Sequence, residues 1–499
     1  MAADRKPLAP LPMRLALHHF TSDPGLKQRD GVNLAHTEIT RLLGTEAPPD
    51  LQVEFHDFDL LLRDPDRALK TLEGVDCVLC NVGPHAHYYH HLRERLGLNF
   101  RIVRDIKTAL WSSYLLQESL CEPYLRPGDT LLATSHYSRV LTQHLFPHLR
   151  GCSIHLFEPV LASAGESSAP RRKPVPESEP VTLGYVGRLS EDKNFPQVVD
   201  LLIALNRREP GRYRLIACGA IHSDTCHPEQ IANRVRLETG RDGLFTYRPP
   251  VEHDRVLTLL RQFDYFLFFS TSNLEVLGRV VIEAAHAGVP VLAANHAAAS
   301  ELLAPASLID VRYAHEQPFH SHFDAPLGRI DIDMAADKIR RKEIPDAPAP
   351  PHVNRTEDFL RVLRQGPGAL PYGDMAVIHP AQREFLAQLR WENLRRFASK
   401  VEASAVIEEM LDWFCALNGK GAPDFSARLE SLEQRSRFKE RTRRFKATAL
   451  QTRCDFTNLG GIDIELCNIV DYHPRFWLSE PGIPSAVETC VAVPAPDLA

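Results

Sequence analysis

The sequence of 499 residues contains no apolar run long enough to cross a bilayer. Its longest dense run, FDYFLFFS, is far shorter than the roughly 20 residues that a membrane-spanning helix needs. The first residues, MAADRKPLAPLPM, also lack the apolar segment of a signal peptide. We therefore expect a cytoplasmic protein, and a hydrophobic content of 44% allows it a sizeable core.

The sequence also lacks an excess of positive charge and a cluster of cysteines. The net charge of -6 argues against a dedicated nucleic-acid binder. Cys77 and Cys80 are spaced as CxxC, but they lie in GVDCVLCNVG, which is typical of a buried strand. Because residues i and i+3 of a strand point to opposite faces, the pair predicts two buried thiols rather than redox or zinc chemistry. The histidine-rich stretch HAHYYHH offers no convincing ligand geometry either, so no metal is expected.

What the sequence does contain is a repeated alternation of strand and helix patterns, which predicts an α/β fold with mainly parallel sheets. The alternation runs through residues 1–162 and restarts at residue 181, after a Ser-, Pro- and charge-rich linker at 163–180. We expect two Rossmann-like domains, residues 1–162 and 181–375. Residues 376–499 form a helical extension and an irregular tail, and the helical part is a candidate for packing back on the first domain.

The second domain has the clearer pattern. Its expected strands are residues 181–187, 213–219, 243–249, 264–270, 289–294 and 307–312. Its expected helices are residues 195–208, 228–240, 253–263, 279–288 and 299–304. In the first domain, strands are expected at residues 13–20, 51–58, 75–83, 99–105 and 129–135.

Two glutamates flank a glycine where a strand pattern in the second domain becomes a helix pattern. Ligands bind outside the carboxyl ends of strands in such sheets, which places Glu275 in the binding crevice. The helix that opens near Gly278 presents unpaired N–H groups that suit phosphate, and a residue without a Cβ lets the phosphate approach. Glu283, one turn further, can accept hydrogen bonds from a ribose diol.

A second loop carries two cations at the same edge. The strand that ends at Gly187 is followed by Arg188 and Lys193, and both side chains suit a diphosphate. Taken together, two cations, a helix start and two carboxylates predict a site for a nucleotide diphosphate that carries a polyol. Taken singly, Glu275 and Glu283 would be ordinary surface acids.

These residues resemble a known family. GRLSEDKN, the E-x7-E spacing of Glu275 and Glu283, and AAHAGVPVLAA followed by Glu301 are similar to the donor-binding domain of family-4-type retaining glycosyltransferases of the GT-B fold. The specific match covers roughly residues 181–305. The resemblance implies two Rossmann-like domains facing a central cleft.

The resemblance also implies a role for each matching residue. Arg188 and Lys193, after Gly187, would hold the donor diphosphate, Glu283 the ribose and Glu275 the donor sugar. Backbone at Leu277, Gly278 and Arg279 would meet phosphate and sugar, although Leu277 replaces the usual aromatic residue. On the first domain, Gly31 and Asn33 would lie on the acceptor side, and either His85 or His87 would approach the donor sugar.

The function implied is transfer of a sugar from a nucleotide sugar to an acceptor hydroxyl, with retained anomeric configuration and no cofactor or metal. The acceptor is a glycan, a lipid-linked sugar or a small molecule, as in glycan biosynthesis. Two rivals stay open: a non-catalytic nucleotide-sugar binder or scaffold, and a phosphorylase or epimerase on the same fold.

Two features outside these motifs have plainer interpretations. The favoured interpretation of the basic segment 435–446 is a solvated helix face. The alternative interpretation is peripheral contact with anionic lipids at the cytoplasmic face of a membrane. His296 is expected to be a residue of the crevice edge or the core rather than a base.

Overall fold

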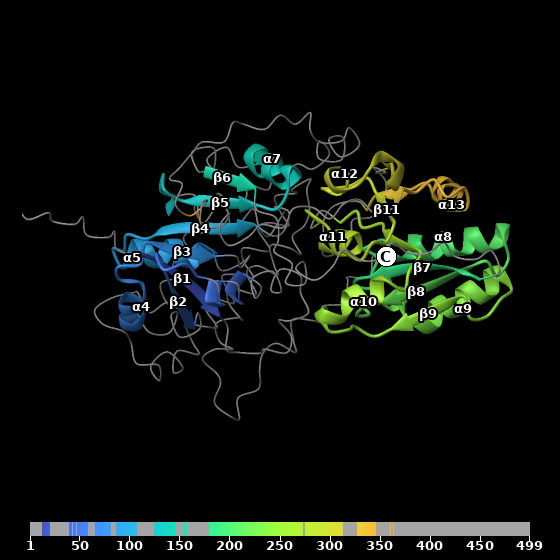
Figure 1. Ribbon diagram of the computed structural model, residues 1–499, viewed down its shortest axis with the longest axis horizontal. Coiled ribbons are helices and arrows are strands. Elements are labelled where there is room, and N and C mark those ends of the chain that lie inside the picture. Colours follow the sequence, from blue (N-terminus) through green and yellow to red (C-terminus); the bar gives the residue numbers. More distant parts are fainter. Residues whose placement is uncertain are drawn as a thin grey trace, which may run out of the picture.

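The computed structural model describes part of the chain. The described residues are 12–19, 39–57 apart from 42 and 46, 65–80, 86–106, 124–145, 153–156, 179–312 apart from 273 and 274, 327–345, 360 and 363. They contain two parallel sheets of six strands, which lie side by side in Figure 1. This architecture confirms the predicted α/β fold with two Rossmann-like sheets.

The first sheet has the strand order β2-β1-β3-β4-β5-β6. Its strands are β1 (Met13–His19), β2 (Leu51–Asp57), β3 (Cys77–Cys80), β4 (Arg101–Ile106), β5 (Thr130–Ala133) and β6 (Ser153–Leu156). Helices α4 (Pro65–Leu72), α5 (Ala86–Arg95) and α7 (His136–Leu145) belong to the same part of the chain. As expected, Cys77 and Cys80 are buried in β3, in the middle of this sheet.

The second sheet has the order β12-β11-β10-β7-β8-β9, which is a doubly wound arrangement. Its strands are β7 (Val181–Val186), β8 (Tyr213–Cys218), β9 (Phe245–Arg248), β10 (Tyr265–Phe268), β11 (Val291–Ala294) and β12 (Leu308–Ile309). Its helices are α8 (Phe195–Arg208), α9 (Pro228–Thr239), α10 (Val256–Leu260), α11 (Arg279–His286), α12 (Ala299–Leu302) and α13 (Ile332–Arg340).

Helices cover both faces of the second sheet, so its strands are buried on both sides. One apolar cluster joins the sheet to α8, α9 and α13, and another joins it to α10, α11 and α12. These two layers explain why the strands read as continuous apolar runs in the sequence. They also fix the carboxyl ends of the strands as the edge where loops can form a site.

The core of the first sheet includes a contribution from much later in the chain. Leu360 and Leu363 are buried with Leu15, Leu17 and Val103, and the Arg101 guanidinium donates to the Leu363 carbonyl. The chain therefore returns to the first sheet after it completes the second. The predicted helical extension and tail, residues 376–499, lie outside the described residues, as does the linker up to residue 178.

Some elements differ from the sequence prediction. The expected strand 307–312 divides into β12 and β13 (Val311–Arg312), and the latter pairs antiparallel with β14 (Arg329–Ile330). The expected helix at 253–263 is a single 3-10 turn followed by the short α10. The sequence pattern missed β6, β14 and α13.

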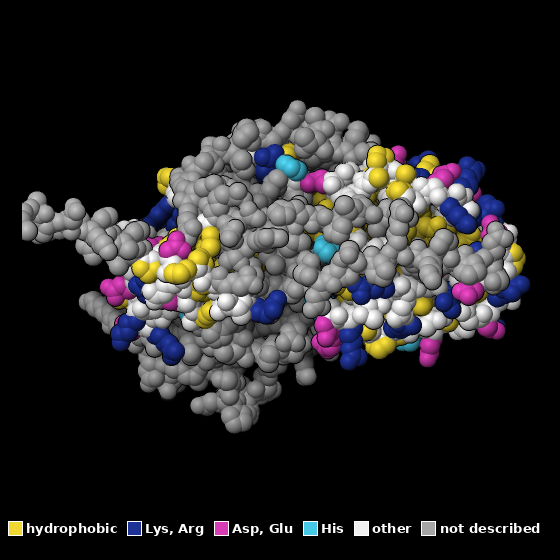
Figure 2. Space-filling model, in the orientation of Figure 1, with side chains coloured by type: hydrophobic (Ala, Val, Ile, Leu, Met, Phe, Trp, Pro, Cys, Tyr) yellow, Lys and Arg dark blue, Asp and Glu magenta, His cyan; other side chains and the backbone are white. Residues whose placement is uncertain are grey.

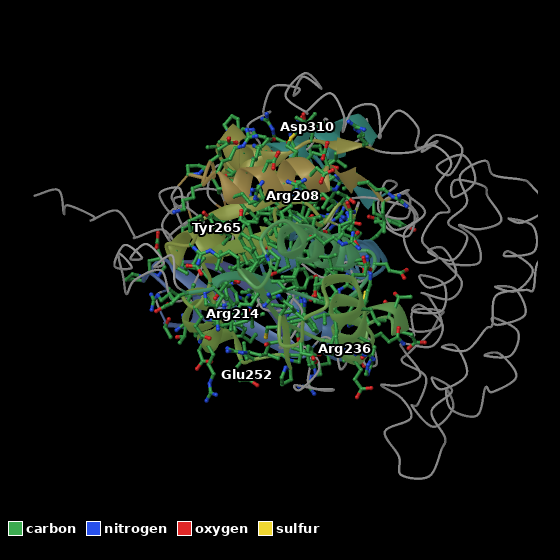
Figure 3. All side chains as sticks on the ribbon, turned by 90° about the vertical axis from the view of Figure 1, so that its right-hand side faces the viewer. Arg208, Arg214, Arg236, Glu252, Tyr265 and Asp310 are labelled. Atoms are coloured by element: carbon green, nitrogen blue, oxygen red, sulfur yellow. The ribbon has the colours of Figure 1, made fainter. Side chains whose placement is uncertain are left out.

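The surface of the second domain mixes both charges. Figure 2 shows Lys and Arg side chains interspersed with Asp and Glu over this part of the molecule. Arg208 at the end of α8 (labelled in Figure 3), for example, pairs with Asp333 and Asp337 of α13 at 2.5 and 2.6 Å. In the described part of the chain, no helix is long and apolar enough to span a membrane.

Candidate functional site

The strand order of the second sheet reverses between β7 and β10. In open α/β sheets, ligands bind outside the carboxyl ends of the two strands at such a point. The loop after β7 carries Arg188 and Lys193, and the loop after β10 carries Glu275 and leads to Gly278. The topology thus brings the two predicted motifs to one place.

Lys193 and Glu275 are in direct contact across this point. The Lys193 ammonium lies 2.6 Å from a carboxylate oxygen of Glu275, with side chains 22% and 14% exposed. The two residues are 82 positions apart in the sequence, so only the fold brings them together. The two loops that the sequence predicts at one edge of the sheet are therefore joined by this pair.

Asn194 explains how the two loops are held. It adopts a left-handed backbone conformation at the start of α8, with φ of 53°. Its buried side-chain amide donates to the Phe269 carbonyl at 2.9 Å and to the Thr271 hydroxyl at 2.7 Å. Sequence reasoning missed this residue, and its place between Lys193 and a helix that opens with proline was the available signal.

The Glu275 carboxylate is kept ionised. Burial alone would raise its pKa, but the charge and hydrogen bond of Lys193, with a smaller contribution from His296, lower the pKa below its usual value. His296 is buried beside it, with Nε2 lying 2.9 Å from the Ser272 carbonyl. Burial lowers the pKa of His296 to about 4, so the imidazole is neutral at pH 7. His296 is therefore a core residue at the edge of the site, as expected.

Arg188 is held by its own loop. Its guanidinium lies 2.8 Å from Asp192, a carboxylate that is almost completely buried. The buried hydroxyl of Tyr185 donates to the Arg188 carbonyl, and the charges of Arg188, Asp192 and Glu275 all act on the pKa of Tyr185. Burial is the main cause that raises this pKa. Asp192 is thus the charged partner of the Arg188 side chain.

Helix α11 begins at Gly278, as predicted. Gly278 has φ of 73°, and an added Cβ would lie 2.9 Å from the ring of Phe268. Glycine is therefore required here by the backbone and by packing. The preceding Leu277 is buried, so it packs inside the protein. Gly187, the other glycine of the site, has φ of 155° and leads out of β7.

Glu283 is buried and paired inside the protein. Its carboxylate accepts a hydrogen bond from Nε of Arg279 at 3.0 Å, and His253 Nε2 lies 3.9 Å from the same oxygen. A solvated helix acid is therefore the wrong interpretation of Glu283, which is 7% exposed. The pairing with Arg279, four residues earlier, could have been predicted from helical spacing.

The residues predicted on the first domain are outside what the structure describes. Gly31, Asn33 and His85 lie beyond the described residues, and His87 lies in α5 with its side chain undescribed. A different pair of histidines occupies the described strand ends. His18 and His56 are buried there against Tyr89, whose hydroxyl is 2.7 Å from Nε2 of His56.

Within the described ranges, no group of three His, Cys, Asp or Glu side chains is placed to hold a metal ion. The site instead presents cations, a helix start and carboxylates. This combination can bind a diphosphate through its negative charge and a sugar or ribose through its hydroxyls.

The family described as "Glycosyl transferases group 1" matches residues 167–317. Among solved structures, the chain is similar to the lipopolysaccharide outer core galactosyltransferase WaaB, at 15% identity and a TM-score of 0.42, over 59% of this chain and 84% of that chain. The Anabaena protein HepE in complex with UDP-glucose gives the same four values. Trehalose-6-phosphate synthase OtsA has 12% identity and a TM-score of 0.47, over 66% of this chain and 90% of that chain. No curated protein sequence matches the chain.

Proposed function

We propose that the chain, whose residues 167–317 match the family of group 1 glycosyl transferases, transfers a sugar from a nucleotide sugar to an acceptor hydroxyl with retained configuration and without a metal. The contact between Lys193 and Glu275 at the strand-order reversal is the single observation that best supports the proposal. It brings a cation, a carboxylate and the loop before α11 to the place where this fold binds ligands.

The donor diphosphate would be bound by Lys193, Arg188 and the amides at the start of α11. A diphosphate competes with Glu275 for Lys193, because an ammonium donates to either anion. When Lys193 turns to the phosphate, the Glu275 carboxylate becomes available to accept hydrogen bonds from the donor sugar. Glu283, held by Arg279, would accept from the ribose hydroxyls.

The chemistry then needs no group beyond these residues and the substrates. The bond between the anomeric carbon and the phosphate oxygen breaks, and the acceptor oxygen bonds to the same face of that carbon. The acceptor proton passes to the leaving phosphate oxygen. Lys193, Arg188 and the amides of α11 stabilise the charge that develops on the diphosphate, which is the largest contribution expected from the protein.

The acceptor would enter from the first domain, through Gly31, Asn33 and one of His85 and His87. The acceptor classes proposed are a glycan, a lipid-linked sugar or a small molecule. We also propose a cytoplasmic location. The alternative is peripheral contact with a membrane through segment 435–446.

Release of nucleoside diphosphate from UDP-, GDP-, ADP- and dTDP-sugars tests the proposal. We expect slow hydrolysis of at least one donor, lost at least 100-fold in Glu275→Ala and in Arg188→Ala. Glu238→Ala and Arg208→Ala are matched controls, because each removes a charge that is ion-paired elsewhere on the domain.

The rival functions predict other outcomes. A donor that raises the melting temperature without any turnover over a panel of acceptors identifies a binder. Cleavage that depends on inorganic phosphate identifies a phosphorylase, and interconversion of the sugar without an acceptor identifies an epimerase.

A further inference from the structure

The start of helix α7, in the first domain, is capped by a residue of the second domain. The backbone N–H groups of His136 and Tyr137 donate to the two carboxylate oxygens of Glu301, at 2.9 and 2.7 Å. The first N–H groups of a helix have no partner inside it, and a carboxylate satisfies them while complementing the helix dipole. Glu301 lies in α12, which Figure 1 shows beside α7.

A second bond joins the same helix start to the proposed donor site. The Ser135 hydroxyl donates to the Val276 carbonyl at 3.0 Å, and this bond is buried. Val276 directly follows Glu275 in the loop that leads to Gly278. The first domain thus supports the backbone of the loop that carries Glu275.

A third contact involves the residue beside Glu275. The rings of Tyr137 and His296 have centroids 6.4 Å apart, and both side chains are buried. His296 contacts the Ser272 carbonyl in the same loop. Residues 135–137 therefore contact two loops of the second domain. Ser135 contacts the loop after β10, and Tyr137 contacts the loop after β11.

We propose that Glu301 is a positioning residue for glycosyl transfer, because its two bonds to the start of α7 hold the first domain where Ser135 and Tyr137 support the loop that carries Glu275. This inference rests on the proposed function. A helix start that is capped from within its own domain would fix only that helix, whereas Glu301 fixes one domain on the other.

The expected consequence is a loss of rate rather than of nucleotide affinity. A misplacement of about 1 Å between reacting groups can cost about 100-fold in rate. Arg188 and Lys193, which are proposed to hold the diphosphate, lie in the loop after β7 and not in the loop that Ser135 contacts. Glu301→Ala is therefore expected to lower the rate of donor hydrolysis by about 10- to 100-fold. The affinity for the nucleoside diphosphate should change less than about twofold.

The control variant is Asp331→Ala. Asp331 also caps a helix with its carboxylate, accepting from the Met334 N–H at 3.0 Å, but it lies at the start of α13 within the second domain. Both variants lose one capping carboxylate, and only Glu301→Ala loses the bond between domains. Glu301→Gln is a partial rescue, because one side-chain amide oxygen can still accept an N–H bond.

The experiment has two readouts on the full-length chain. Hydrogen exchange should become about 10-fold faster at the start of α7 in Glu301→Ala, with the Met334 amide unchanged, and the reverse is expected in Asp331→Ala. Hydrolysis should fall in the order wild type, Glu301→Gln, Glu301→Ala, and stay at the wild-type rate in Asp331→Ala. Ser135→Ala, which removes the bond to Val276 and the bond that the Ser135 hydroxyl accepts from the Ser138 N–H, should lower the rate in the same direction with both bonds of Glu301 intact.

The outcomes separate this inference from the proposed function. Unchanged exchange at α7 in Glu301→Ala refutes the cap, and faster exchange with an unchanged rate refutes the positioning role. If UDP, GDP, ADP and dTDP all fail to raise the melting temperature of the wild type, the proposed function is wrong. The positioning role would then be wrong with it, whereas the exchange result would still decide whether the cap exists.

Discussion

Each domain contains a close pair of opposite charges, and the two pairs are built differently. In the first domain, Arg93 and Asp129 are 1% and 5% exposed and make two parallel contacts of 2.7 and 2.9 Å. In the second domain, Lys193 and Glu275 make a single contact of 2.6 Å and keep partial access to solvent. One pair lies within the fold, and the other lies at the carboxyl ends of the strands.

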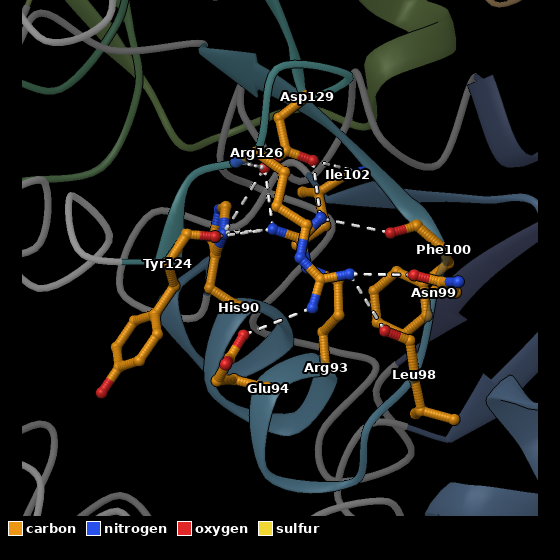
Figure 4. A network of polar contacts seen from close by, with 10 residues as sticks. All are labelled: His90, Arg93, Glu94, Leu98, Asn99, Phe100, Ile102, Tyr124, Arg126 and Asp129. Atoms are coloured by element: carbon orange, nitrogen blue, oxygen red, sulfur yellow. Dashed lines mark hydrogen bonds and ion pairs between the residues drawn. The ribbon is translucent and has the colours of Figure 1, made fainter.

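The carboxylate of the pair in the first domain is saturated with partners. Figure 4 shows that each carboxylate oxygen of Asp129 accepts two bonds, one from Arg93 and one from the backbone N–H of Ile102 or Arg126. The Arg93 guanidinium also donates to the carbonyls of Phe100 and Tyr124. Burial acts to raise the pKa of Asp129, but the hydrogen bond from Arg93 and the nearby charges lower the pKa by more. The net pKa lies below its usual value, so the carboxylate stays ionised.

The difference shows which pair can exchange its partner for a ligand. A saturated, buried pair has no room for a new anion, and breaking it leaves a charge without compensation. A singly bonded pair at the strand ends can open, because water or a phosphate can take the place of either partner. We therefore assign a structural role to Arg93–Asp129 and a proposed binding role to Lys193–Glu275.

Removal of Asp129 should give the largest effect on stability. We expect Asp129→Ala to lower the free energy of unfolding by about 3–5 kcal/mol, because the Arg93 charge then stays buried without a partner. Glu275→Gln should cost only about 1 kcal/mol, since Lys193 can turn to solvent. Denaturation in urea measures both. Equal losses in the two variants would abolish the distinction between the pairs.

The next largest effect on stability is expected at the backbone of the site. Gly278→Ala combines a positive φ with a Cβ placed 2.9 Å from Phe268, and we expect a loss of about 2–4 kcal/mol. Gly240→Ala is the matched control, because Gly240 has φ of 69° and nothing within 4 Å of an added Cβ. It should lose about 1 kcal/mol. Thermal unfolding of both variants decides whether packing at the start of α11 matters beyond the dihedral angle.

Two buried histidines, one beside each charged pair, make the stability of the protein depend on pH. Burial lowers the pKa of His90, beside Asp129, to about 3, and that of His296, beside Glu275, to about 4. Both values lie below the usual 6.5, so the stability each neutral imidazole contributes is complete above pH 6.5. It is lost as the pH falls from there toward the folded pKa.

At pH 5 this linkage should cost about 2 kcal/mol for each histidine, because the unfolded chain takes up a proton that the folded protein does not. His90→Gln and His296→Gln should each reduce the loss of stability between pH 7 and pH 5 by that amount. Urea denaturation at the two pH values measures the difference within each variant. A loss that stays as large as in the wild type would show that the imidazole is not buried in its neutral form.

The sequence was sufficient to predict most of the second domain. Residues 195–208 form α8 as expected, because an apolar stripe lies between Pro196 at its start and arginines at its end. The placement of Lys193 and Glu275 at one edge of the sheet also followed from the sequence, since parallel strands end at the same edge. Their direct contact did not follow from it.

Other features depend on tertiary contacts that no local pattern encodes. β6 has four residues and gains its stability by pairing with β5. The cap of α7 by Glu301 joins residues that are 165 positions apart. The conformation of Asn194 depends on carbonyls from other segments of the second domain. Such contacts arise only when the surrounding chain is already folded.

Binding of nucleoside diphosphates to a Lys193 variant tests the central claim most directly. We expect at least one of UDP, GDP, ADP and dTDP to bind the wild type in calorimetric titration, and Lys193→Met to weaken it by about 10- to 100-fold. Lys338→Met is the control, because Lys338 donates to the carbonyls of Ala306 and Leu308 instead. Equal affinity in the wild type and Lys193→Met would contradict a diphosphate site at this pair.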